Sequence, residues 1–119
     1  MSEKIRLYKT AREVFEEATT LILGSSACRV VYFHLKQRIG RDPYEVLLEK
    51  PEIFYEEYEN LFSKSVDLLL NYVGNYIVER YGVDCSPQEF VKLLQRGGES
   101  SKDKMTEIMA KIYEKSKKK

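Results

Sequence analysis

The stretch Ser63-Lys-Ser-Val-Asp-Leu-Leu-Leu-Asn-Tyr-Val-Gly-Asn-Tyr-Ile-Val-Glu-Arg-Tyr-Gly82 decides the fold. Apolar side chains recur in it at spacings of three and four, the period of one helix face: Val66, Leu69, Leu70, Val73, Ile77 and Tyr81. Four more widen this surface almost around the helix axis: Leu68, Tyr72, Tyr76 and Val78. A helix that is apolar on most sides is covered by its neighbours, so we expect a long central helix that ends at Gly82.

The rest of the chain predicts further helices, because no segment keeps the period-two pattern of a β-strand. The expected helices cover residues 2–23, 25–39, 43–50, 51–62, 87–96 and the chain from about residue 101. Asp42-Pro43 and Ser86-Pro87 are clear helix starts, since each pairs a capping side chain with a proline that fits the first turn. The fold class is therefore all-α, a single compact bundle of six to seven helices around the long central one.

The first two helices have apolar faces that we expect to point into the bundle. In the first helix these residues are Leu7, Ala11, Val14, Ala18 and Leu21. In the second helix they are Ala27, Val30, Val31, His34, Leu35 and Ile39.

The polar run Gly98-Glu99-Ser100-Ser101 predicts a hinge between a body, residues 1–97, and a terminal helix with a lysine-rich tail, residues 102–119. The terminal helix has an apolar stripe made of Met105, Ile108, Met109 and Ile112, with Tyr113 beside it. An isolated helix does not keep such a stripe in water, so it packs on its own bundle, on a second copy or on a partner. Methionines suit an adaptable docking face, and we therefore expect a homodimer in which this helix takes part.

Charge is unevenly distributed along the 119 residues, although the formal net charge is only +1. Residues 21–41 contain four cations and no acid: Arg29, Lys36, Arg38 and Arg41. Residues 42–60 contain seven acids against one lysine, and residues 102–119 contain seven lysines against three acids. Such segments are usually solvated helix faces, but the four cations are also candidate nucleic-acid contacts.

Residues with catalytic or metal-binding chemistry are few. His34 is the single histidine, and neither a zinc-ligand pattern nor a phosphate loop occurs. Two cysteines do not make a disulfide framework, so we expect Cys28 and Cys85 to be small side chains in the core. We therefore expect no cofactor, no metal and no catalytic residue.

Composition also bears on the compartment. No run approaches the roughly 18 apolar residues of a membrane span, and we expect a cytoplasmic protein. Charged residues make up 33% of the chain while Asn and Gln are scarce, which favours a heat-adapted source.

One segment resembles a known family. It contains Leu35-Lys36-Gln37-Arg38-Ile39-Gly40, then Asp42-Pro43, then Pro51-Glu52-Ile53-Phe54-Tyr55 and Leu61-Phe62. This pattern resembles an uncharacterised family of small archaeal helical domains described as a signalling output domain, over roughly residues 21–77. The resemblance implies an archaeal, helical, non-catalytic domain, and it assigns no catalytic residues.

Three functions remain open from the sequence. The first is a non-enzymatic interaction module that docks a protein or a second copy. The second is a nucleic-acid-associated regulator that uses the basic segment 29–41 and the C-terminal lysines. The third is a small enzyme of unrecognised class.

Overall fold

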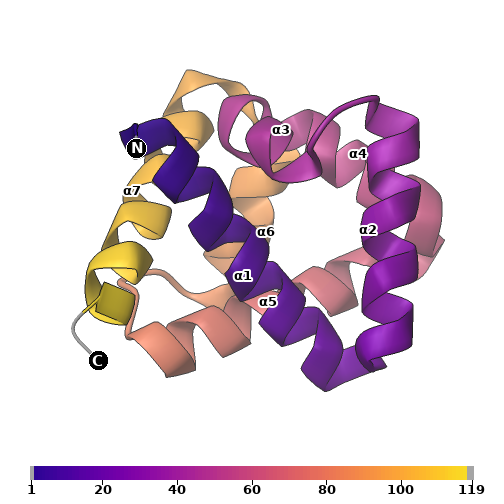
Figure 1. Ribbon diagram of the computed structural model, residues 1–119, viewed down its shortest axis with the longest axis horizontal. Helices are drawn as coiled ribbons and strands as arrows, with labels where there is room; N and C mark the ends of the chain where they lie inside the picture. The colour runs from indigo at the N-terminus through magenta and orange to yellow at the C-terminus, as the bar shows by residue number, and fades with distance from the viewer. Residues whose placement is uncertain (1, 118–119) are drawn as a thin grey trace.

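The structure, a computed structural model, describes residues 2–117, and nearly all of them are helical (Figure 1). Seven α-helices and one 3₁₀ turn follow in order: α1 (Glu3–Leu23), α2 (Ser25–Ile39), α3 (Pro43–Glu49), α4 (Pro51–Phe62), η1 (Ser63–Ser65), α5 (Val66–Tyr81), α6 (Pro87–Arg96) and α7 (Gly98–Lys117). No strand occurs in residues 2–117. The predicted all-α fold is confirmed, and the expected helix positions are correct to within one turn.

Helix α1 crosses the middle of the molecule, and α2, α3, α5 and α7 all pack against it. Figure 1 shows α1 running diagonally across the front, with α2 along the right and α7 along the left. Behind α1, α6 packs between α4 and α5. The core forms where these layers meet: the ring of Phe15 on α1 lies 5.5 Å from that of Phe54 on α4 and 6.1 Å from that of Phe90 on α6.

The helix starts follow the local sequence. The side chain of Ser86 accepts a 3.1 Å hydrogen bond from the Glu89 amide, and the Glu89 carboxylate accepts a 3.3 Å bond from the Ser86 amide. This reciprocal pair satisfies two amides that a helix start otherwise leaves without partners. Asp42 caps α3 with a single bond, which its side chain accepts from the Tyr44 amide at 2.9 Å. The capping predictions at Asp42-Pro43 and Ser86-Pro87 are confirmed.

Helix α5 is buried on one side only. Leu69, Leu70, Val73 and Ile77 are each at most 7% exposed, as the helical period predicts. The expectation that neighbours cover most of this helix is wrong, because Leu68 and Tyr72 are exposed. The covering helices α1, α4 and α6 contact the buried side and leave the other side in solvent.

Two further residues expected in the core are exposed. Leu21 lies in the last turn of α1, and Val30 lies on the side of α2 away from the buried Cys28, Val31 and Leu35. The run Val30-Val31 places apolar residues on both sides of α2, and only one of those sides meets the bundle. The inward assignment of Leu21 and Val30 was therefore wrong.

The expected hinge at residues 98–101 is also wrong, because these residues form the first turn of α7. The chain turns at Gly97 instead, where φ is +64° and ψ is −159°. Ser101 is buried, which ties this turn to the bundle. The lysine-rich end of the chain is helical as far as Lys117; Lys118 and Lys119 lie outside the described residues.

Candidate functional site

The apolar stripe of α7 belongs to the core of its own chain. Met105, Ile108, Met109 and Ile112 are each at most 2% exposed. Helix α7 packs against α1, α3, α4 and α6, which together cover the stripe. These four residues therefore cannot form the docking face that we expected, and the intramolecular alternative is correct. Tyr113 beside them is half-buried, with the guanidinium of Arg6 5.4 Å from its ring centre.

The basic residues of segment 29–41 divide into two pairs. Arg38 binds both carboxylate oxygens of Glu57, at 3.2 and 3.3 Å, and Arg41 Nη2 lies 2.8 Å from Glu49 Oε1. These contacts neutralise half of the basic segment with acids of segment 42–60. Arg29 and Lys36 are exposed, and within residues 2–117 neither takes part in an ion pair.

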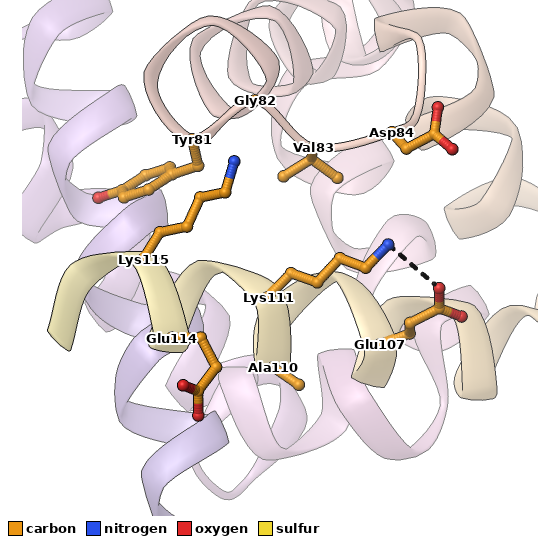
Figure 2. Close-up of a pocket in the computed structure, with 9 residues that line it drawn as sticks. All are labelled: Tyr81, Gly82, Val83, Asp84, Glu107, Ala110, Lys111, Glu114 and Lys115. Carbon is orange, nitrogen blue, oxygen red and sulfur yellow. Dashed lines mark ion pairs between the residues drawn. The ribbon is translucent and has the colours of Figure 1, made fainter. Parts of the chain in front are cut away.

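An open groove of about 520 Å³ lies between the α5–α6 loop and α7 (Figure 2). Tyr81, Val83 and Ala110 supply its apolar surface. Five charged side chains surround it: Asp84, Glu107, Lys111, Glu114 and Lys115. Lys111 is already paired with Glu107 at 3.5 Å, as the dashed line in Figure 2 shows.

Lys115 in this groove lies beside the end of α5. Its ammonium group points toward the end of α5, and a methyl group on Gly82 would lie only 2.9 Å from Lys115 Nζ. Gly82 ends α5 with φ +61° and ψ 37°, a left-handed conformation that suits glycine. A cation at a helix C-terminus is stabilised by the carbonyl groups exposed there. Lys115 therefore lies where a cation favours the end of α5, and Lys111 is paired with Glu107.

A more distinctive surface lies on α1, α2 and α5. Five large apolar side chains are more than half exposed: Leu21 at 73%, Val30 at 66%, Phe33 at 65%, Leu68 at 60% and Tyr72 at 53%. All five belong to these three helices, and no large apolar side chain described on α3, α4, α6 or α7 reaches 40%. We call this surface the α1/α2/α5 face. Its α2 part could have been found in the sequence, because Phe33 lies across the helix from Val31 and Leu35.

The groove between α1 and α2 forms one half of the face. The guanidinium of Arg12 lies 4.5 Å from the ring centre of Tyr32 and 2.7 Å from Glu16 Oε1. Arg29 and Phe33 line the same groove from α2. This half combines an exposed aromatic ring with cations, and we call it the basic half.

The groove between α1 and α5 forms the other half. Glu13, Glu17, Leu21 and Tyr76 line it. The hydroxyls of Tyr76 and Tyr81 donate to the same oxygen of Glu17, at 3.2 and 3.1 Å. Burial, and then the Glu17 carboxylate, raise the pKa of both tyrosines, so both stay protonated donors near neutral pH. We call this the acidic half; Leu68 and Tyr72 precede Tyr76 by two turns and one turn on α5.

The histidine and the two cysteines were the residues considered for metal-binding or nucleophilic chemistry. Among residues 2–117 no three His, Cys, Asp or Glu side chains are placed to hold a metal ion. Both cysteines are buried, and burial raises the pKa of the Cys85 thiol, which disfavours the reactive thiolate. His34 is half-buried on α2.

None of the helices in residues 2–117 combines the length and the apolar character that crossing a bilayer requires. Comparisons with protein-family models, curated proteins and solved structures found no match. The resemblance to a family of small archaeal helical domains therefore stays a prediction.

Proposed function

We propose that this chain is a non-enzymatic interaction module that binds a protein through the α1/α2/α5 face. The observation that carries this proposal is that the five most exposed large apolar side chains all lie on α1 and on two helices that pack against it, α2 and α5. Single exposed apolar residues are common on protein surfaces, whereas a group of them is typical of an interaction site. An exposed phenylalanine such as Phe33 is the type of side chain that is enriched at interface cores.

The surroundings of these residues support a protein partner. Arg12, Arg29 and Lys36 on one side, and Glu13 and Glu17 on the other, flank the apolar residues. Charge around an apolar centre gives an interface its orientation and suppresses wrong partners.

The nucleic-acid alternative has weaker support. A nucleic-acid surface needs cations that follow the phosphate backbone, and Arg38 and Arg41 are held by Glu57 and Glu49. Within segment 29–41 only Arg29 and Lys36 remain for phosphates, and Glu13 and Glu17 on the same face repel them. Of the C-terminal lysines that this alternative also uses, Lys104 and Lys111 are paired with Glu107. Phe33 could still stack on a base, so the experiment below includes nucleic acid as an outcome.

The test is photo-crosslinking at position 33 in extract of the source organism. Phe33 is replaced by benzoyl-phenylalanine, and the control carries the same residue at Ile53, an exposed apolar position on α4. We expect a protease-sensitive adduct from position 33 and none from position 53. Excess wild-type chain should compete for the partner and so reduce the amount of adduct, whereas excess Phe33→Asp chain should leave the amount of adduct unchanged. A nuclease-sensitive adduct would favour the nucleic-acid function, and the absence of any adduct at position 33 would overturn the proposal.

A further inference from the structure

We infer that the partner on the α1/α2/α5 face is a second copy of this chain, bound across a twofold axis near the outer surface of α1. This inference rests on the proposed function, which identifies the face but not its occupant. It is carried by the distribution of charge on the face.

The basic half has cations that find no ion pair within the described residues. Arg29 and Lys36 lie on α2 one turn before and one turn after Phe33, and all three are exposed. Helix α2 contains no acid at all. This half therefore needs carboxylates from outside the chain if its cations are to be neutralised when Phe33 is buried.

The acidic half has the opposite requirement. Glu13 is exposed and forms no ion pair within residues 2–117, and Glu17 is bound by tyrosine hydroxyls rather than by a cation. Leu21, the most exposed of the large apolar side chains, lies one turn beyond Glu17. This half needs cations together with an apolar side chain, which is what the basic half presents.

The two halves adjoin along α1. The groove beside α2 and the groove beside α5 share two lining residues, Glu16 and Thr20, both on the outer side of α1. Figure 1 shows α1 crossing the front of the molecule with α2 beside it. A surface whose basic half lies beside its acidic half complements itself after a rotation of 180°. Such isologous contact is the commonest form of protein dimer.

A twofold axis near Glu16 and Thr20 makes two equal sets of contacts. Arg29 of each copy meets Glu13 of the other, and Phe33 of each copy covers Leu21 of the other. A standard interface takes about 800 Å² from each partner, roughly one eighth of the 6839 Å² surface of this chain. Three neighbouring helices in a molecule with extents of 35 × 29 × 28 Å provide an area of that size.

The test exchanges the charges of the two halves in the full-length chain. Arg29→Glu makes the basic half acidic, and Glu13→Arg makes the acidic half basic, so each variant repels a copy of itself. When the two variants are mixed, both cross-axis pairs again join opposite charges. Light scattering at micromolar concentration should give twice the 14.0 kDa chain mass for the wild type, the single mass for each variant and twice the mass for the mixture.

Two variants control for charge change alone. Glu56→Arg on α4 and Lys92→Glu on α6 reverse exposed charges outside the face, and both should stay dimeric. Far-ultraviolet circular dichroism should show all four variants folded, since none of the replaced side chains is buried.

Several results would overturn the inference. A monomeric wild type, variants that stay dimeric, or a mixture that stays monomeric would each contradict the twofold pairing of Arg29 with Glu13. The proposed function would survive any of these results if the crosslink at position 33 identified a different protein. It would fail, independently of the mass measurement, if position 33 formed no crosslink.

Discussion

The hydroxyl of Tyr8 on α1 donates a 2.8 Å hydrogen bond to Oε2 of Glu49, the last residue of α3. Arg41 binds the other oxygen of the same carboxylate, also at 2.8 Å. Burial, and then the bond to Glu49, raise the pKa of Tyr8 to about 12. The hydrogen bonds from Arg41 and from Tyr8 lower the pKa of Glu49. This junction joins α3 to α1, which crosses the middle of the bundle.

The Glu49 junction predicts a specific loss of stability in acid. Because the native pKa of Glu49 lies below its ordinary value of 4.5, the ionised carboxylate stabilises the fold at neutral pH. That contribution disappears as the pH falls through the native pKa. Urea denaturation from neutral pH to about pH 3 should therefore show a smaller loss of unfolding free energy for Glu49→Gln than for the wild type. Glu56→Gln, at an exposed site without a bonded partner in residues 2–117, should show the wild-type loss.

The buried side of α5 predicts that shortening the Leu70 side chain strongly lowers the free energy of unfolding. Its side chain is 0% exposed, so Leu70→Ala removes apolar contacts and leaves a cavity. Such substitutions lower the free energy of unfolding by about 2–5 kcal/mol. Leu68→Ala, on the exposed side of the same helix, should cost less than about 0.5 kcal/mol. Equal effects of the two substitutions in urea denaturation would contradict the orientation of α5.

The buried stripe of α7 predicts that this helix is required for folding. Met109→Ala should lower the free energy of unfolding by about 2–5 kcal/mol, whereas Glu114→Ala on the exposed side should have little effect. Truncation after Gly97 should remove the helical circular dichroism of the whole chain, not only the share of α7. A truncated chain that keeps a cooperative thermal transition would show that α7 is an appendage after all.

The turn after α4 predicts a stabilising substitution. Ser63 is the one described non-glycine residue with positive φ, at φ +52° and ψ −127°. A non-glycine residue in this backbone conformation lowers the free energy of unfolding by about 1–3 kcal/mol. We expect Ser63→Gly to raise the free energy of unfolding by about 1 kcal/mol, even though glycine gains entropy in the unfolded chain. Ser65→Gly, where φ is −86° and ψ −2°, should instead destabilise the protein. Thermal melts of both variants test this difference in sign.

Gly97, which precedes α7, and Gly98, the first residue of α7, should differ in how much an alanine substitution destabilises the protein. Gly97 and Gly98 have φ of +64° and +81°, so both substitutions strain the backbone. At Gly97 the added methyl group would also lie 2.6 Å from Cβ of Glu52, whereas nothing lies within 4 Å at Gly98. We expect Gly97→Ala to lower the melting temperature more than Gly98→Ala. If the two shifts were equal, Glu52 would not restrict this turn.

Helix positions could be read from the sequence because they depend on nearby residues. The capping pair Ser86 and Glu89, the proline at Pro43 and the apolar period of α5 each act within one or two turns of chain. The candidate site could be read only in part. The cations of segment 29–41 were identified, but Phe33 at the centre of the basic half was not.

The sequence by itself therefore determined an all-α chain, the ends of its helices to within one turn and the apolar stripe that each one has. Only the tertiary structure decided which stripes are covered. Met109 was expected at an interface and lies in the core, whereas Val30 was expected in the core and lies in solvent. The period of an apolar stripe arises from residues three and four positions apart. Its burial depends on segments far away in the chain, as when α1 packs against α7. Those contacts between distant segments form only when the whole bundle packs.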